Sequence, residues 1–273
     1  GIYRIEPWVE PELAGEVGAL NNAGQRVNGL VAGAGNAGSG YLEWLDARGF
    51  DTESIWSFGV NVSDTGLDKG QGAGSWHPDF YGPDGATSRV LYAKDWTSDA
   101  GGSYDGVDGD GHGTNCAGVV GGFNDDASPG SSTVSPTGYR FGLGVAPNVK
   151  LGGSKIFDFN GSWGLTASYG DIEKYAYSQG ARISSNSWGA DVNDYTWDAR
   201  TYDELVRDAD PSTPGNQEMV ILFAAGNSGP LPNSVGTPGN AKNVITLAAA
   251  ENWWPGYTAC GWSSAFQNTP GDD

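Results

Sequence analysis

The stretch MVILFAAGNSG, at residues 219–229, decides the fold class of this chain. Its first seven residues are all apolar and include β-branched side chains, a pattern that predicts a strand buried on both faces. The remaining residues form a glycine-rich turn and place the amide of Asn227 directly after the strand. Strands buried on both faces are typical of parallel sheets covered by helices, whose chemistry gathers at the carboxyl ends of the strands.

The same pattern recurs along the chain and alternates with segments of helical character. Further strands are predicted at residues 58–62, 149–157, 181–185 and 243–249, and helices at residues 113–122, 165–178 and 197–209. The alternation predicts an α/β fold of three layers, in which a mostly parallel β-sheet is flanked by helices. We assign residues 51–273 to one domain and residues 1–50 to an N-terminal lead-in, because residues 21–40 are rich in glycine and alanine and poor in charge.

The charge balance narrows the choice of partners. The 33 acidic and 14 basic residues leave a net charge of −19, which repels the phosphates of nucleic acids and of anionic lipids. The longest apolar runs are also shorter than the roughly 18 residues that a membrane-spanning helix needs. The sequence therefore predicts no nucleic-acid partner and no membrane partner. The excess of acidic residues is consistent with a secreted protein. It is also explained, more plainly, as a well-solvated surface.

Cysteine and histidine are too few for the common zinc sites. The chain holds 2 of each, with no C-x-x-C pair and no H-E-x-x-H motif. Spacing alone does not decide whether Cys116 and Cys260 are bonded, and we expect both thiols to be free. The sequence opens at Gly1 without a basic and apolar leader, so we expect that any secretory signal has been removed or never existed.

Three polar side chains are predicted to lie at strand ends or at the start of a helix, where parallel α/β proteins place their functional groups. Asp64 follows the strand at residues 58–62, and Asn227 follows the strand at residues 219–225. His112 lies between glycines at the start of a predicted helix rich in small residues, and this setting favours a functional role. Each residue also has a plainer interpretation: a turn aspartate, a satisfied core or surface histidine, and a turn-forming asparagine. Asp-Thr-Gly at residues 64–66 also marks aspartic proteases, whereas Asn227 can donate to a developing oxyanion.

Taken together, Asp64, His112 and Asn227, in this order in a parallel α/β chain, resemble the subtilisin-like serine proteases. The segments VAPNVKL (residues 145–151), KIFD (residues 155–158) and RISSNSWG (residues 182–189) are similar to family segments in the same order. Residues 180–251 are especially similar to bacterial alkaline subtilases that carry an additional C-terminal β-barrel. The resemblance covers about residues 56–262.

The resemblance implies an endopeptidase that works through an Asp-His-Ser triad on polypeptide substrates. Asp64 would orient the imidazole, His112 would take the proton of the serine, and Asn227 would donate to the oxyanion. A substrate would pair as an added strand and reach a primary pocket with small residues along one wall. The residues implied for these two roles are Ser187, Trp188 and Gly189 for the strand, and Ala224, Ala225 and Gly226 for the wall.

Calcium is the metal that the resemblance implies, in a structural role. Its candidate ligands are Asp198 and Asp203, which are also explained as a helix start and a solvated face. The acids at positions 105, 108 and 110 do not complete the calcium-loop spacing. We expect no organic cofactor. We also expect the protein to be secreted.

The sequence departs from the family pattern at the nucleophile. Subtilases take their serine from a Gly-Thr-Ser-Met-Ala segment downstream of the oxyanion asparagine, and no Gly-Thr-Ser occurs in the 273 residues. We therefore expect a C-terminal companion, as a separate chain or a continuation, to supply the serine. The alternatives are a noncatalytic subtilase-like protein that binds or supports other molecules, and an unrelated α/β protein whose motifs arise by chance.

Overall fold

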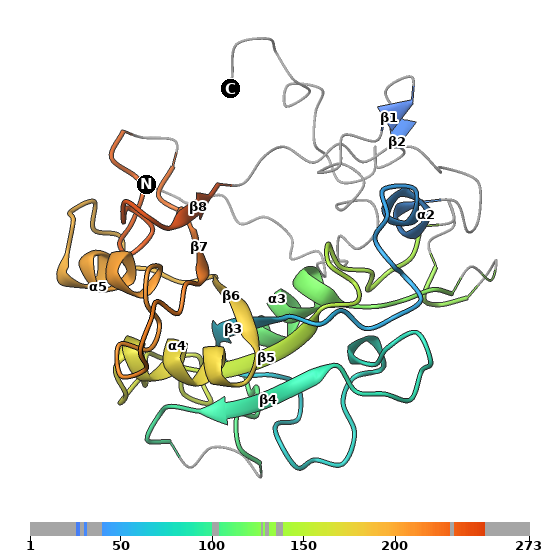
Figure 1. Ribbon diagram of the computed structural model, residues 1–273, viewed down its shortest axis with the longest axis horizontal. Helices are drawn as coiled ribbons and strands as arrows, with labels where there is room; N and C mark the ends of the chain where they lie inside the picture. The colour runs from blue at the N-terminus through green and yellow to red at the C-terminus, as the bar shows by residue number, and fades with distance from the viewer. Residues whose placement is uncertain are drawn as a thin grey trace, which may run out of the picture.

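The computed structural model of the protein describes residues 40–99, 104–126, 128, 131–134, 139–229 and 232–248, together with the short strands β1 (Arg26–Val27) and β2 (Leu30–Val31). Within these residues, the centre is a six-stranded sheet in the order β4-β5-β3-β6-β7-β8, and all its neighbouring strands run parallel (Figure 1). The strands are β3 (Gly59–Asp64), β4 (Val90–Asp95), β5 (Lys150–Lys155), β6 (Ala181–Asn186), β7 (Val220–Ala224) and β8 (Ile245–Leu247).

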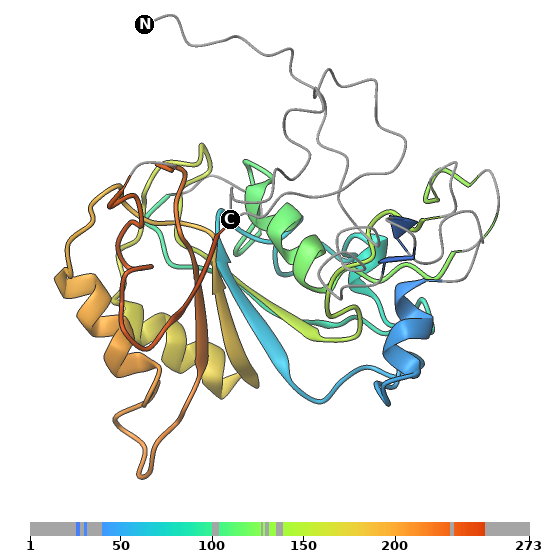
Figure 2. The same cartoon turned by 90° about the horizontal axis from the view of Figure 1, so that it is seen from above.

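Helices cover both faces of this sheet, which confirms the predicted three-layer α/β fold (Figure 2). On one face, α3 (His112–Gly121) packs against β3 and β5. On the other, α4 (Tyr169–Ser178) packs against β6, and α5 (Trp197–Leu205) lies beside it. Each face has its own apolar core, with Val62 and Leu151 buried on the α3 side and Tyr202 and Phe223 on the other. Burial of each such side chain contributes about 1.5 to 3 kcal/mol.

The chain changes direction across the sheet at β3. From β3 it moves outward to β4 and returns through β5, and it then continues on the opposite side of β3 through β6, β7 and β8. In open parallel sheets, ligands bind beyond the carboxyl ends of the strands at a switch point of this kind. Asp64 is the last residue of β3, so the topology places this carboxylate at the position where chemistry is expected.

The structure contains a strand that the sequence analysis missed, namely β4. It begins with four apolar residues and ends in two charged ones, Lys94 and Asp95. β4 lies at the edge of the sheet, where charged side chains remain accessible to water. Tyr92 of this strand lies against the β5 backbone at Gly152, where a Cβ atom would approach the tyrosine ring to 2.4 Å. A side chain at this position of β5 would therefore displace the Tyr92 ring.

The ends of two helices differ from the predicted ones for local reasons. α4 begins at Tyr169 because Ser168 caps it: the serine Oγ accepts from the backbone N–H of Asp171 at 3.1 Å, and the Asp171 carboxylate accepts from the Ser168 N–H at 3.2 Å. α5 ends at Leu205, after which the chain turns back and the N–H of Ala209 donates to the carbonyl of Gln217. Among the described residues, no helix has the length and apolar character needed to cross a membrane.

Part of the segment assigned to the lead-in packs onto the domain. Residues 41–46 form helix α2 (Tyr41–Asp46), in which Tyr41, Leu42 and Leu45 are buried. The Tyr41 hydroxyl donates to the backbone carbonyl of Val145 at 2.7 Å. The end of the lead-in thus contributes to the packing of the domain, whereas most of residues 1–39 lie outside the described residues.

A chain of buried polar side chains crosses the sheet below its carboxyl edge. Asn61 accepts from the hydroxyl of Tyr92 at 2.8 Å and donates to Ser184 at 3.2 Å. Ser184 in turn donates to the carboxyl group of Glu173 on α4 at 2.9 Å. The second carboxyl oxygen of Glu173 has no hydrogen-bond partner among the described residues. Burial raises the pKa of Glu173 from 4.5 to about 7.

Replacing Glu173 by glutamine is expected to stabilise the protein at pH 8 and to have a much smaller effect at pH 5. The folded protein holds the Glu173 proton up to about pH 7, whereas the unfolded chain releases it near 4.5. The stability that the neutral carboxyl group provides is therefore present below pH 4.5 and is lost as the pH rises to about 7. Above that, the loss amounts to about 3 kcal/mol, which an uncharged amide avoids.

Denaturant unfolding at both pH values measures this effect. Glu53→Gln serves as the matched control, because Glu53 is an exposed carboxylate. An equal gain at pH 5 and pH 8 for Glu173→Gln contradicts the assignment of a buried neutral carboxyl group.

Candidate active site

Asp64 is a buried carboxylate at the end of the central strand. Its side chain is 1% exposed. Oδ1 accepts from the backbone N–H of Thr65 at 2.7 Å and faces Nδ1 of His112, also at 2.7 Å. Oδ2 is buried and has no hydrogen-bond partner in the described part of the chain. A buried carboxylate is unfavourable unless it is paired, so the His112 ring provides the compensating partner.

His112 is the first residue of α3, and its ring meets Asp64 from the helix side of the site. The side chain is 51% exposed, so the imidazole has one nitrogen against the protein and remains accessible to solvent. Because Nδ1 is engaged by Asp64, Nε2 is the ring nitrogen left to accept a proton from another molecule. The hydrogen bond to Asp64, and secondly that to Cys116, raise the pKa of His112 above its ordinary value of 6.5. The neutral ring, which forms as the pH rises through this pKa, can accept a proton at Nε2.

Cys116 is a neighbour of this pair that the sequence analysis did not place there. Its Sγ lies 3.7 Å from Nδ1 of His112, and the thiol is free, as expected. Cys116 follows His112 by four positions on α3, and residues at this spacing share one face of a helix. That spacing is the sequence signal that predicts the contact. Cys260 lies outside the described residues.

Asn227 lies in the exposed turn that follows β7, at the same carboxyl edge of the sheet as Asp64. Gly226 before it has a φ of 96°, a left-handed conformation that favours glycine. Ala224 and Ala225 are partly buried, and the Ala225 N–H donates to the carbonyl of Leu247 on β8 at 2.8 Å. The strand thus fixes the three small residues before Asn227, while its amide stays open to solvent.

The segment implied to bind substrate follows β6 directly. Ser187 and Gly189 are exposed, and Trp188 is half-buried. The Trp188 indole donates to Asn186 at 3.2 Å and has several aromatic neighbours. No described residue hydrogen-bonds with the backbone of Trp188 or Gly189. The rings around Trp188 are those of Trp163, Tyr169, Tyr202 and Phe223.

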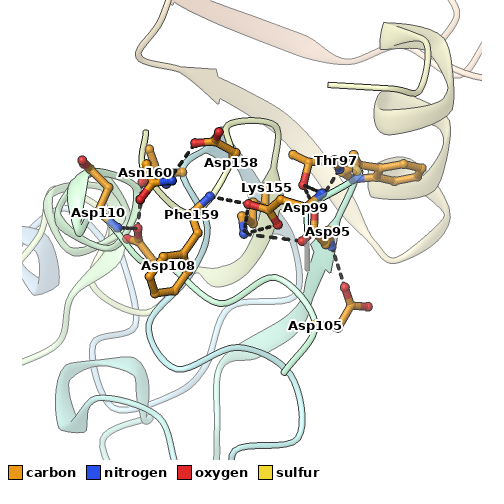
Figure 3. A network of polar contacts seen from close by, with 12 residues as sticks. Asp95, Thr97, Asp99, Asp105, Asp108, Asp110, Lys155, Asp158, Phe159 and Asn160 are labelled. Atoms are coloured by element: carbon orange, nitrogen blue, oxygen red, sulfur yellow. Dashed lines mark hydrogen bonds and ion pairs between the residues drawn. The ribbon is translucent and has the colours of Figure 1, made fainter. Parts of the chain in front are cut away.

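A buried lysine with two acidic partners lies beside the Asp64 strand (Figure 3). Lys155 is the last residue of β5, is paired in register with Asp64, and is 0% exposed. Its Nζ lies 3.1 Å from a carboxylate oxygen of Asp99 and 3.5 Å from one of Asp95. An ammonium group without water needs such partners. The sequence gives no sign of this network, because the lysine and its partners lie far apart in the chain.

The two candidate calcium ligands lie on α5 but do not converge. Asp198 and Asp203 are five positions apart, so their side chains leave the helix about 140° apart. The carboxylate of Asp203 already accepts from the hydroxyl of Tyr195 at 2.8 Å and from the N–H of Asn243 at 2.6 Å. These two residues therefore do not fit a shared calcium ion.

The described fold and site define a class of protein: a parallel α/β protein that presents a carboxylate-supported imidazole at the carboxyl edge of its sheet. The sequence model described as the subtilase family (Peptidase_S8) matches residues 57–270, and the chain belongs to this family. The resemblance inferred from the motifs is thereby confirmed.

Several proteins are similar to this chain. Serine protease AprX of Bacillus subtilis (strain 168) is 32% identical over 71% of this chain and 38% of its own length. The thermophilic serine proteinase of Bacillus sp. (strain AK1) is 28% identical over the same shares. The structure of the psychrophilic subtilisin-like protease Apa1 from Pseudoalteromonas sp. AS-11 matches 70% of this chain and 35% of that chain, with 21% identity and a TM-score of 0.45. The chain thus spans about 38% of the length of these two curated relatives.

Proposed function

We propose that this chain is the N-terminal part of the catalytic domain of a serine endopeptidase. The observation that carries the proposal is the 2.7 Å contact between Asp64 and Nδ1 of His112, with the ring otherwise accessible. In the reaction, His112 takes the proton of a serine hydroxyl through Nε2 while the serine oxygen attacks the peptide carbonyl. Asp64 keeps the ring in the required tautomer and stabilises the imidazolium that forms.

The serine comes from a segment beyond residue 273. Membership of the subtilase family and the absence of Gly-Thr-Ser from the sequence support this part of the proposal. Asn227 donates its amide to the oxyanion of the tetrahedral intermediate, a role supported by its exposed place after β7. Such a donor contributes about 10² to 10³ in rate.

A fluorophosphonate probe tests the proposal on the natively produced protein. We expect the probe to label a serine outside residues 1–273 and expect the protein to cleave an unfolded polypeptide. Substitution of Asn227 by alanine is expected to lower the rate of labelling by about 10² to 10³. If the natural product ends at residue 273, folds cooperatively and resists the probe, the proposed endopeptidase activity is contradicted. That result favours the noncatalytic subtilase-like binding protein.

Polypeptides are the proposed substrates, bound as an added strand along residues 187–189. The backbone of Trp188 and Gly189 has no partner among the described residues, which supports this role. Backbone pairing of this kind provides affinity with little side-chain selectivity. Selectivity then comes from the pockets beside the Trp188 ring and the small residues at 224–226.

Replacing Trp188 by alanine is expected to change the ratio of kcat/KM between peptides with large and small side chains by about tenfold. The half-buried indole both packs on Phe223, at 5.2 Å between ring centroids, and borders the proposed substrate strand. A peptide series measures the effect. Trp188→Phe is the control, since it keeps an aromatic ring there. If Trp188→Ala only lowers the melting temperature and leaves the peptide preference flat, the side chain serves packing alone.

Calcium remains a proposal, based on the resemblance rather than on Asp198 and Asp203. Removal of a bound structural ion lowers the melting temperature, because the ion binds only the folded protein. We therefore expect a chelator to lower the melting temperature of the natively produced protein and added calcium to restore it. An unchanged melting temperature with and without chelator removes calcium from the proposal.

We also propose that the protein is secreted. The net charge of −19 is compatible with this, since a large net charge keeps a protein soluble. Fractionation of the producing culture tests the proposal. Recovery of the protein from the cell interior alone contradicts it.

A further inference from the structure

Asp108 binds both halves of the candidate site with one carboxylate. Oδ1 accepts from the hydroxyl of Thr65 at 2.8 Å, from the N–H of Gly111 at 2.8 Å and from the N–H of Asp110 at 3.2 Å. Oδ2 accepts from the N–H of Thr114 at 2.8 Å and from its hydroxyl at 2.5 Å. Figure 3 shows the contact between Asp108 and Asp110. Five donors on one half-buried carboxylate form a local hub rather than a surface contact.

Through Thr65, this hub reaches the Asp64 side of the site. A carboxylate has no proton to donate, so the Thr65 hydroxyl must direct its own hydrogen at Asp108. The hydroxyl oxygen is thereby left to accept, and it does so from the N–H of Gly113 at 2.8 Å. Thr65 follows Asp64, and Gly113 follows His112. One hydroxyl group therefore links the residue after the carboxylate with the residue after the imidazole.

Through the start of α3, the hub reaches the His112 side. The residue before the helix is Gly111, which has no side chain to cap the helix. The first three helical N–H groups are satisfied from outside: that of His112 by Asp110 at 3.2 Å, that of Gly113 by Thr65 and that of Thr114 by Asp108. The negative charge of Asp108 also suits the positive end of the helix dipole. Asp108 thus replaces the missing cap.

The position of His112 depends on this helix start because little else holds the ring. Its side chain is 51% exposed, so packing does not fix it. The backbone at Gly113 lies directly against the Asp64 loop, where a Cβ atom would come within 2.4 Å of the Gly66 carbonyl oxygen. A small shift of the first turn of α3 therefore changes the distance between the imidazole and the carboxylate.

We propose that Asp108 is a positioning residue that keeps His112 and Asp64 in hydrogen-bond contact by joining the start of α3 to the loop after β3. This inference rests on the proposed function and deepens it. Asp108 touches neither substrate nor the reacting atoms. It acts through the geometry of the pair, so its loss affects turnover more than substrate binding. A misplacement of about 1 Å in such a pair costs about a hundredfold in rate.

The test compares Asp108→Ala, Asp108→Asn and Thr65→Val with the natively produced protein. The readouts are kcat and KM, and the nitrogen-15 NMR titration of His112, whose signal is identified by its absence in His112→Ala. We expect Asp108→Ala to lower kcat about a hundredfold, to change KM less than about twofold and to lower the pKa of His112. Asp108→Asn keeps one acceptor oxygen and is expected to restore part of both values. Thr65→Val removes the link and the acceptor of the Gly113 N–H but keeps the bonds from Gly111 and Thr114 to Asp108, and is expected to lower the His112 pKa as well.

Asp84→Ala is the matched control. Asp84 also organises its own loop, accepting from the N–H groups of Ala86 and Thr87 and from the Thr87 hydroxyl, but it has no contact with the site. It is expected to leave kcat and the His112 titration unchanged. If Asp108→Ala lowers only the melting temperature and behaves like Asp84→Ala in both readouts, the proposal is wrong.

If Asp108→Ala does not fold, the variants Asp108→Asn and Thr65→Val test the proposal instead. If kcat and the His112 pKa in both variants equal those of the natural protein, the proposal is overturned. The NMR titration needs no turnover. A protein without peptidase activity or probe labelling therefore contradicts the proposed function, while the His112 titration still tests the role of Asp108.

Discussion

His112→Ala is expected to lower kcat for peptide hydrolysis by about 10⁶ in the natively produced protein and to abolish labelling by a fluorophosphonate. The imidazole is the only group at the end of β3 that combines a buried carboxylate behind it with an accessible ring nitrogen among the described residues. Without it, the serine proton has no acceptor, and the remaining rate comes from binding and the oxyanion donor. KM is expected to change little, because the ring contributes mainly to the transition state.

His77→Ala is the matched control for this substitution. His77 is the other histidine of the chain, is exposed, and accepts a hydrogen bond from the N–H of Asp79 at 3.3 Å. It is expected to leave kcat unchanged. Loss of activity in both variants to the same extent points to a folding defect, and full activity in His112→Ala rejects the triad.

Asp64→Asn is expected to lower kcat by about 10⁴, because the amide favours the wrong imidazole tautomer. The hydrogen bond to Asp64 is the largest cause that raises the pKa of His112, so its replacement lowers that pKa toward the ordinary value of 6.5. Activity needs the neutral ring and therefore rises with pH through the pKa of His112. The midpoint of the rise lies above pH 6.5 in the natural protein and moves to lower pH in Asp64→Asn.

The profile of kcat/KM against pH measures this shift. Asp84→Asn serves as the control, since its carboxylate contacts only its own loop and is expected to leave the midpoint in place. A reduced rate in Asp64→Asn with an unmoved midpoint contradicts direct coupling of the two groups.

The sequence predicted most of the sheet, and the central pair of Asp64 and His112, for identifiable reasons. The strands β3 and β7 were predicted because both contain β-branched residues in short, mostly apolar segments that end in glycine-containing turns, as strands buried on both faces do. The contact between Asp64 and His112 followed from the order of motifs and from the rule that strand ends gather at one edge. β4 was missed because an edge strand tolerates charge.

The remaining features of the site depend on contacts between distant segments, which a linear pattern does not record. Asp108 was considered only as a metal ligand, since its Thr65 partner is 43 positions away. The burial of Lys155 depends on Asp99, which is 56 positions away. The calcium pair on α5 shows the opposite case: the resemblance implied a shared site at Asp198 and Asp203, but the helical repeat directs the two side chains apart.

The two members of the central pair rest on parts of the fold that open with very different ease. β3 is hydrogen-bonded on one side to β5 and on the other to β6, so its amides exchange with solvent only when the sheet itself opens. His112 sits in the first turn of a helix, where fraying needs far less energy. We therefore expect any early separation of the imidazole from Asp64 to begin at that first turn, and expect the amides of the turn to exchange with solvent faster than those of β3.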